Sequence, residues 1–261
     1  MFTNVYCETI AVPVYFAVTL IPYYVARSIE WCDQFRISPT QPWGTTGKWG
    51  VVQRHGLADA AEFSVLYVGP LALLDTFVQK RFPGVDPAVF EGRSRFGWQT
   101  ERVVPQEAPS LAALVGGTLG ALLLYDAYFY FLHILLHAVP EVYARVHAVH
   151  HTHTTLLASF TNRLSVVERL AIILGANECL KLVSAHPLTR LLFIAIFVPL
   201  LADSHSGYDF PIWYDKVLPF LGGPRRHYWH HVRGDRYFEP FFTHLEWLTP
   251  HLLPAITRKS R

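Results

Sequence analysis

The chain has 261 residues, of which 51% are hydrophobic and 16% are charged, and its formal net charge is +2. A typical soluble protein has about 25% charged residues, so this composition indicates a membrane protein. The small charge argues against a nucleic-acid-binding function, which needs a concentrated basic face. Three widely separated cysteines argue against a disulfide framework.

The N-terminal half begins with a charge-free run over residues 9–26 that just reaches the length of a membrane span. Glu8 precedes the run and no basic segment does, so we interpret it as a retained span and not as a signal peptide. Residues 28–56 are polar and are expected to form a loop. Residues 57–78 form a weaker span, for which a helix lying in the membrane interface is the alternative.

The C-terminal half contains the clearest span, residues 111–132, after a long polar stretch that ends at residue 109. Two apolar runs follow, residues 166–183 and 188–202, with a His-Pro turn between them. They predict a helical hairpin that enters the bilayer and returns. The fold class is therefore all-α: an integral membrane bundle of about four to five membrane helices with a histidine-rich cap.

Three histidine motifs organise the second half of the chain. On a helix, residues three or four apart share a face, so each motif can present several imidazoles together. Neutral imidazole is the commonest metal ligand, and eight imidazoles are too many for one ion and suit two. The motifs are one H-x-x-x-H and two H-x-x-H-H, formed by His133 and His137, by His147, His150 and His151, and by His227, His230 and His231.

This ordered set resembles the membrane-bound fatty acid hydroxylase and sterol desaturase superfamily, over roughly residues 125–231. The segments HSGYDFP (residues 205–211) and GGPRRHYWHH (residues 222–231) look most like the branch of C-4 methylsterol monooxygenase and cholesterol 25-hydroxylase. The resemblance divides the single folding unit into N-terminal membrane helices and polar loops (residues 1–109) and a histidine-box catalytic region (residues 110–261).

The resemblance implies a non-haem diiron oxygenase that hydroxylates, desaturates or stepwise oxidises an unactivated C–H bond of a sterol or other lipid. Its cofactors would be two iron ions, with O2 as co-substrate. The chain has no flavin or dinucleotide motif, so electrons derived from NAD(P)H would come from cytochrome b5 or its reductase. The implied location is the endoplasmic reticulum membrane, multi-pass, with the active site facing the cytosol and the N-terminus in the lumen.

The resemblance carries the eight box histidines over as metal ligands and makes His205 the ninth. Other branches have a second histidine four residues after the position of His205, where this chain has Asp209. Asp209 and His153 are therefore further candidate ligands. Asp126 lies on the same helical stripe as His133, and a carboxylate at membrane depth is a candidate hydrogen-bond partner for a ligand histidine. The alternative for Asp126 is a role in helix packing.

Several alternatives remain open from the sequence. The substrate could be a terpenoid or polyketide of specialised metabolism instead of a sterol or acyl lipid. A histidine-rich metal transporter would carry ionisable residues along a path at mid-membrane depth, whereas these histidines gather at one level. A catalytically inactive relative acting as an interaction protein is a third reading, against which the complete set of box histidines argues.

Overall fold

The computed structural model describes residues 6–37, 65, 68–77, 105–152 and 156–249, and within them the protein is helical. Its β-structure there is limited to two isolated bridges, Arg36 with Tyr208 and Leu221 with Phe242. The all-α expectation is confirmed. The helices in chain order are α1 (Cys7–Ser28), η1 (Glu30–Phe35), α4 (Gly69–Phe77), α5 (Leu111–Ala138), α6 (Pro140–Val142), η5 (Tyr143–His147), η6 (His150–Thr152), η7 (Ala158–Asn162), α7 (Val166–Leu182), α8 (Pro187–Ser204), α9 (Tyr214–Val217), α10 (Pro224–Arg233) and α11 (His244–Leu248).

Three described helices are long and apolar enough to cross a membrane: α1, α5 and α8. The sequence predicted about four to five. Most of the predicted second span, residues 57–78, lies outside the described residues apart from α4. The predicted hairpin is present as α7 and α8, but α7 has 17 residues and includes Glu168 and Arg169 in its first turn.

Helix α5 extends well past the end of the predicted span. Ser110 caps its first turn by accepting a hydrogen bond from the Ala113 backbone N–H, and Val139 and Pro140 follow its last residue. At 1.5 Å per residue its 28 residues are about 42 Å long, against about 30 Å for the hydrocarbon core. The last turns, which carry His133 and His137, can therefore reach the membrane interface.

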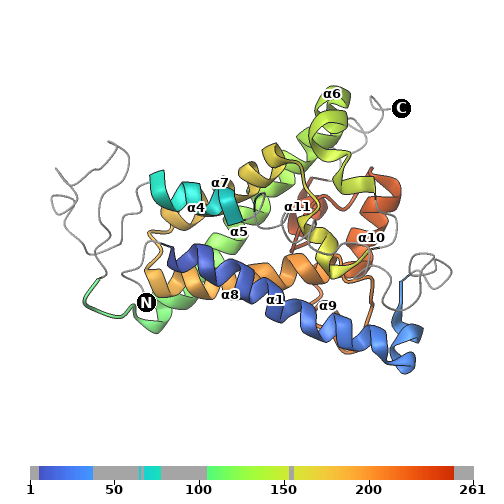
Figure 1. The fold of residues 1–261 in the computed structure, drawn as a ribbon, viewed down its shortest axis with the longest axis horizontal. Coiled ribbons are helices and arrows are strands. Elements are labelled where there is room, and N and C mark those ends of the chain that lie inside the picture. The colour runs from blue at the N-terminus through green and yellow to red at the C-terminus, as the bar shows by residue number, and fades with distance from the viewer. Residues whose placement is uncertain (1–5, 38–64, 66–67, 78–104, 153–155, 250–261) are drawn as a thin grey trace.

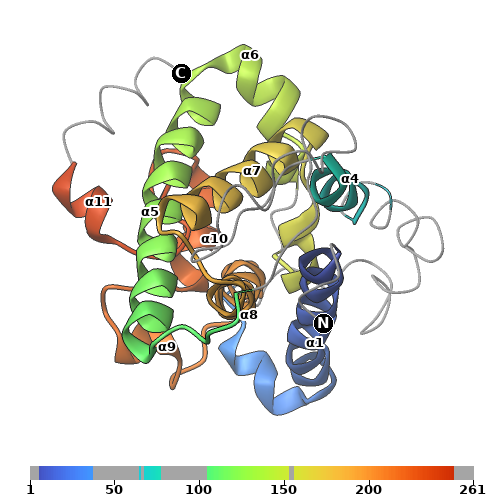
Figure 2. The same cartoon turned by 90° about the vertical axis from the view of Figure 1, so that its left-hand side faces the viewer.

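The three long helices run in the same direction, and α7 runs the opposite way (Figures 1 and 2). Glu8 near the start of α1 contacts Arg190 near the start of α8, and Tyr23 near the end of α1 contacts Asp203 near the end of α8. Helix α5 lies along α8 in the same sense, since its early Gly117 lies beside Thr189 and its later Tyr125 packs on Phe197.

The bundle therefore has two ends. We call the end where α1, α5 and α8 finish the histidine end, because α10 and the segment from α6 to η6 lie there (Figure 1). The distal end is where α1, α5 and α8 begin and where α7 turns into α8. Figure 2, viewed from the distal end, shows α8 between α5 and α1, with α7 crossing above it.

Aromatic side chains fill the middle of the bundle. Tyr125 is fully buried, packs edge-on against Phe197 at 4.7 Å between ring centroids and lies near Phe129 and Phe241. Such pairs contribute about 0.5–1.5 kcal/mol beyond the burial of their area. Because Phe241 follows the last histidine motif, this packing attaches the C-terminal segment to the membrane helices.

Candidate dimetal centre

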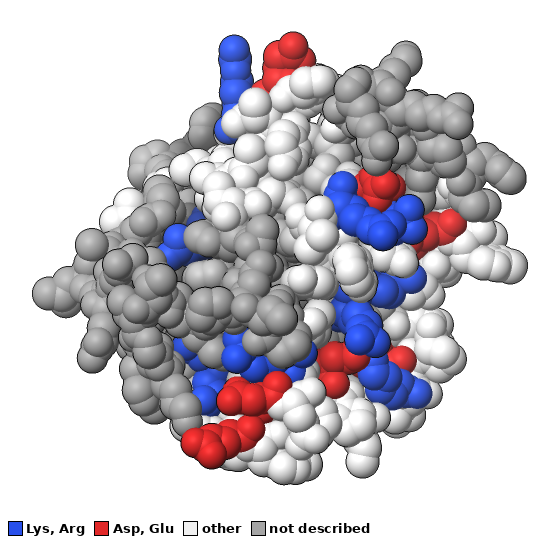
Figure 3. Space-filling model, turned by 90° about the vertical axis from the view of Figure 1, so that its right-hand side faces the viewer, with Lys and Arg blue, Asp and Glu red and all other residues white. Residues whose placement is uncertain are grey.

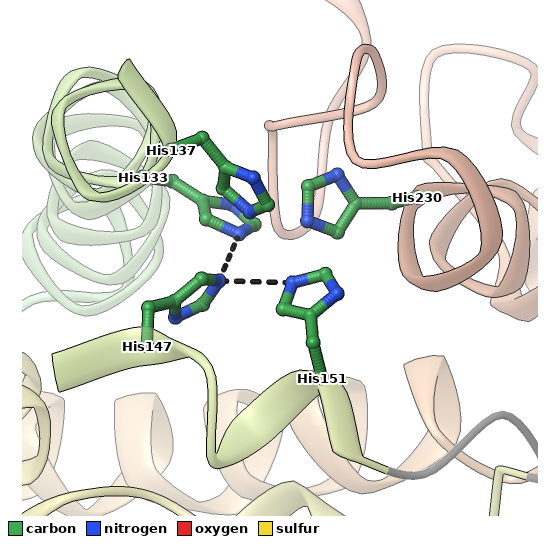
Figure 4. A group of neighbouring side chains, drawn as sticks. All are labelled: His133, His137, His147, His151 and His230. Atoms are coloured by element: carbon green, nitrogen blue, oxygen red, sulfur yellow. Dashed lines mark hydrogen bonds between the residues drawn. The ribbon is translucent and has the colours of Figure 1, made fainter. Parts of the chain in front are cut away.

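Nine histidines converge at the histidine end in two groups. Within each group one ring nitrogen from every member lies within 4.8 Å of those of the others. The first group has five members: His133, His137, His147, His151 and His230. The second group has four members: His150, His205, His227 and His231. Figure 4 shows the first group, whose rings project inward from α5, from the η5–η6 segment and from α10.

The two H-x-x-H-H motifs are shared between the groups in a reciprocal way. His147 and His151 join the first group while His150 joins the second, and His227 and His231 join the second group while His230 joins the first. In α10 the helix period explains this division: at about 100° per residue, His227 and His231 differ by about 40° in direction, while His230 lies about 60° from His227 and about 100° from His231. In each motif the i, i+4 pair stays together and the residue between is directed to the other group.

In the first group, hydrogen bonds fix which ring nitrogen carries the proton. The Nδ1–H of His133 donates to the Phe238 carbonyl at 2.9 Å, and that of His230 donates to the Arg236 carbonyl at 2.8 Å. The Nδ1–H of His147 donates to a carboxylate oxygen of Glu168 at 2.8 Å. Each Nε2 therefore has a lone pair facing the interior of the group.

The second group follows the same rule. The Nδ1–H of His205 donates to the Leu201 carbonyl at 3.1 Å, and that of His150 points to the Arg163 carbonyl at 3.4 Å. The Nε2 atoms of His205 and His150 are then both acceptors, and they lie 3.2 Å apart. Two lone pairs at that distance repel each other unless a cation lies beside both.

The spacing of these nitrogens fits metal binding. Facing Nε2 atoms are 3.1 Å apart for His133 and His147 and 2.9 Å for His227 and His205. Two nitrogens bound at about 2.1 Å to one ion, at a right angle, would be about 3.0 Å apart. The Nε2 atoms of His137 and His230 are also buried without a hydrogen-bond partner. The donor set therefore fits two ions, one in each group.

Burial keeps these imidazoles neutral, which metal binding requires. Loss of hydration lowers the pKa of His205 and of His151 to about 4. Burial, together with the neighbouring imidazoles, also lowers the pKa of other members outside the membrane spans: His147, His150, His227, His230 and His231.

The other candidates from the sequence lie elsewhere. Asp209 contacts Lys216 at 2.5 Å and Arg225 at 3.5 Å. Asp126 accepts hydrogen bonds from the backbone N–H groups of Phe241 and Phe242, and no described histidine donates to it. Its role is to hold the segment after α10 against α5. His153 lies outside the described residues.

A second carboxylate group near Asp126 is also accounted for by backbone contacts. Asp126, Glu239 and His244 lie close enough to share an ion. The two carboxylate oxygens of Glu239, however, accept from the N–H groups of Leu245 and Glu246 at 2.9 and 2.8 Å. This group therefore fastens the start of α11 and does not resemble the facing lone pairs of the histidine groups.

Sequence reasoning missed Glu168, the carboxylate that does contact a motif histidine. Its side chain is 1% exposed. It follows Ser165, whose hydroxyl accepts a hydrogen bond from the Glu168 backbone N–H at 3.1 Å. This S-x-x-E pattern is the signature of a helix capping box, which would assign Glu168 a structural role. Only the tertiary structure shows that its side chain turns to His147 instead.

A largely apolar cavity connects the two histidine groups with the interior of the bundle. His133, His150, His205 and His227 line one end of it. Its middle is lined by aromatic and aliphatic side chains of α5, α7 and α8: Phe129, Ile172, Ile173, Leu180, Phe193, Ile194, Phe197 and Val198. The site is thus open to an apolar molecule that lies along the helices.

Comparison with known proteins agrees with this geometry. The fatty acid hydroxylase family model matches residues 118–250, just over half of the chain and a region that includes all nine histidines. Cholesterol 25-hydroxylase of Rattus norvegicus is 37% identical over 144 residues, which are 54% of this chain and 48% of that protein. No solved structure gives a significant match.

Two further relatives extend the comparison. Cholesterol 25-hydroxylase-like protein 1, member 2 of Danio rerio is 34% identical over 149 residues, 56% of this chain and 54% of that protein. Methylsterol monooxygenase 1-3 of Arabidopsis thaliana is 25% identical over 251 residues, 94% of this chain and 77% of that protein. The matched region thus spans about half the length of the cholesterol 25-hydroxylase relatives. The chain belongs to the fatty acid hydroxylase family.

Proposed function

We propose that this member of the fatty acid hydroxylase family hydroxylates an unactivated C–H bond of a sterol or similar lipid, using two iron ions held by the nine histidines. The observation that carries the proposal is the apolar cavity that ends at four of those histidines. A hydrophobic molecule in this cavity would lie beside histidines of both groups. The balanced reaction takes the C–H compound, O2, two electrons and two protons to an alcohol and water.

The residues of the chain have separate roles in this proposal. The Nε2 lone pairs of the histidines hold the ions, and the Nδ1–H bonds to carbonyl groups fix the ring orientations. Glu168 does the same for His147 and raises the electron density of its ring. When bound, the iron pair supplies the activation of O2 and the oxidation of the C–H bond. The apolar wall of the cavity positions that bond and keeps bulk water away.

The relatives favour a sterol as substrate, because their names refer to cholesterol and to methylsterol. Desaturation, stepwise oxidation, and a terpenoid or polyketide substrate are the alternatives within the same chemistry. Transport of a metal ion is less well supported, because the described aromatic and aliphatic side chains in the middle of the cavity separate the ionisable groups at its two ends.

The distribution of charge supports an orientation with the histidine end in the cytosol. Figure 3 shows this end, where Lys and Arg side chains gather beside Asp and Glu. Of the described elements, those at the histidine end include Arg27, Arg36, Arg145, Lys216, Arg225, Arg226, Arg233 and Arg236. Lys181 lies at the distal turn, and Arg190 lies near the start of α8 at the same end. The basic residues in positions 38–64, 78–104 and 250–261 lie outside the described residues and are not counted.

By the positive-inside rule, the basic residues among the described elements favour a cytosolic histidine end. We propose the endoplasmic reticulum membrane as the location. Electrons would then come from a cytosolic-face donor, cytochrome b5 or its reductase, that docks on the charged surface around the histidine end.

The test is the metal content of the detergent-purified protein. Wild type is expected to hold about two irons per chain, one for each histidine group. The double variants His147→Ala/His151→Ala and His227→Ala/His231→Ala should each lose about one, because each pair belongs to one group. His244→Ala, a partly exposed histidine outside both groups, is the matched control. Zinc or no metal in wild type would remove the oxygenase reaction.

A further inference from the structure

The distal end of the same cavity is polar, which no part of the proposed chemistry uses. Arg190 binds both carboxylate oxygens of Glu8 at 2.6 and 2.8 Å, and its side chain is 6% exposed. The same guanidinium donates to the Asn177 side-chain oxygen at 2.7 Å. Beside them Thr9 donates to Asp75 at 2.5 Å. All five side chains line the cavity whose other end is formed by histidines.

This distal polar cluster, formed by Glu8, Thr9, Asp75, Asn177 and Arg190, is separated from the histidines by much of the length of α8. From Arg190 to His205 there are 15 residues, or about 22 Å along the helix axis. A buried charge pair in a membrane span is costly unless it is fully satisfied, and such groups usually mark a ligand path or site. An ion pair needed only to join α1 to α8 would not have to face the cavity.

We propose that the distal polar cluster binds the hydroxyl group of the lipid substrate, so that the carbon oxidised lies at the end of the molecule opposite that hydroxyl. This inference rests on the proposed function, which it deepens by naming the polar group and its placement. It separates two chemistries within the family: oxidation of a remote hydrocarbon tail, and oxidation of a methyl group next to the hydroxyl-bearing carbon. The geometry points to the first.

The charge of the cluster selects a neutral hydroxyl over an acid. Glu8 and Asp75 bring two carboxylates to the cluster, and the Arg190 guanidinium already binds Glu8 through two hydrogen bonds. A carboxylate or sulfate arriving here would meet two carboxylates, whereas a hydroxyl both donates and accepts and can join the hydrogen-bonded set. Fatty acids in their ionised form are therefore poor ligands for this end.

The first test measures binding and does not depend on turnover. Full-length protein carrying the double substitution His147→Ala/His151→Ala is reconstituted in lipid nanodiscs, and displacement of radiolabelled cholesterol is measured with three competitors of one skeleton. These are the 3-hydroxyl sterol, the 3-ketone, which only accepts hydrogen bonds, and the 3-sulfate. The hydroxyl form should bind roughly 3- to 10-fold tighter than the ketone, the expected effect of one hydrogen bond, and the sulfate should bind more weakly still.

Two substitutions locate the effect. Thr9→Val and Asn177→Leu should each reduce the difference between hydroxyl and ketone, while Thr118→Val should leave it unchanged. Thr118 is a buried threonine of α5 that bonds only its own helix and does not line the cavity. Equal binding of all three sterols, or variants that behave as wild type, would overturn the proposal. Tighter binding of a cationic amine than of the hydroxyl would also overturn it, in favour of a base as the head group.

The second test is the position of the new hydroxyl group in active, iron-loaded wild type. Oxidation on the side chain remote from the 3-hydroxyl is expected, and oxidation at a carbon beside it would refute the placement. Failure of the two proposals can be told apart. A protein that binds the hydroxyl sterol selectively but does not oxidise it contradicts the oxygenase function alone. A protein that oxidises sterols without regard to the 3-substituent contradicts the head-group site alone.

Discussion

Replacement of Glu168 by glutamine tests the architecture of the first histidine group. The carboxylate is nearly fully buried and accepts the Nδ1–H of His147 at 2.8 Å. Glutamine has the same shape, and its amide oxygen can still accept this hydrogen bond. It cannot carry the negative charge that strengthens His147 as a donor to metal. Loss of such a partner typically lowers metal affinity by about 10- to 100-fold, or about 1.4 to 2.7 kcal/mol.

The structure specifies where this loss should fall. Glu168 bonds one member of the first group, and neither His205 nor His150 of the second group depends on it. A chelator titration of the metal-loaded variant should therefore release the metal of one group at roughly 10- to 100-fold lower chelator concentration, with the other unchanged.

Glu178→Gln provides the matched control for this experiment. Glu178 lies on the same helix, pairs with Lys181 and has a side chain that is 58% exposed. Its substitution should leave both release steps in place. The reasoning is refuted if Glu168→Gln releases both metals equally or neither of them. Thermal unfolding of the metal-free variants distinguishes a local effect from a damaged fold.

Three further predictions follow from buried contacts. Asp126→Ala should lower the free energy of unfolding by about 2–5 kcal/mol, because two backbone N–H groups lose their acceptor. Asp126→Asn keeps an acceptor and should lower it by less than half of that amount. Thermal unfolding in detergent compares the two variants. Tyr23→Phe removes a hydrogen bond to buried Asp203 and should cost about 1–3 kcal/mol in the same assay, and an unchanged melting temperature would contradict the contact. For the metal-free protein, burial lowers the pKa of His205 from 6.5 to about 4, so the folded state resists a proton that the unfolded chain accepts. Stability should be constant above about pH 6.5 and fall below it. His205 alone should contribute about 3 kcal/mol to the fall between there and about pH 4, and the other buried histidines with a lowered pKa should add to it, as measured by denaturant titration across pH.

Much of this fold could be predicted because its signals are local. The apolar runs predict α1 and α5, the His-Pro pair predicts the turn before α8, and the spacing of the histidine motifs predicts several imidazoles on one helix face. The helix period also accounts for the division of the H-x-x-H-H motif in α10, since His227 and His231 diverge by only about 40°.

What could not be predicted depends on contacts between distant segments. The stripe shared by Asp126 and His133 left two roles open for that carboxylate, a hydrogen bond to a histidine or helix packing. The residue is instead engaged by the backbone of Phe241 and Phe242, more than one hundred positions away. The same limit concealed the distal cluster: Glu8 reads as the polar edge of a span, and its pairing with Arg190 exists only once α1 lies along α8.

The reciprocal sharing of the two H-x-x-H-H motifs has a consequence for biosynthesis. His227, His230 and His231 are the last of the nine histidines to leave the ribosome, yet they supply two members of the second group and one of the first. Before they arrive, the first group has four members and the second has only His150 and His205. The final motif therefore completes both groups in a single step. A chain truncated before this motif would lack the complete donor set of either group, so only the finished chain presents both sets of histidines together.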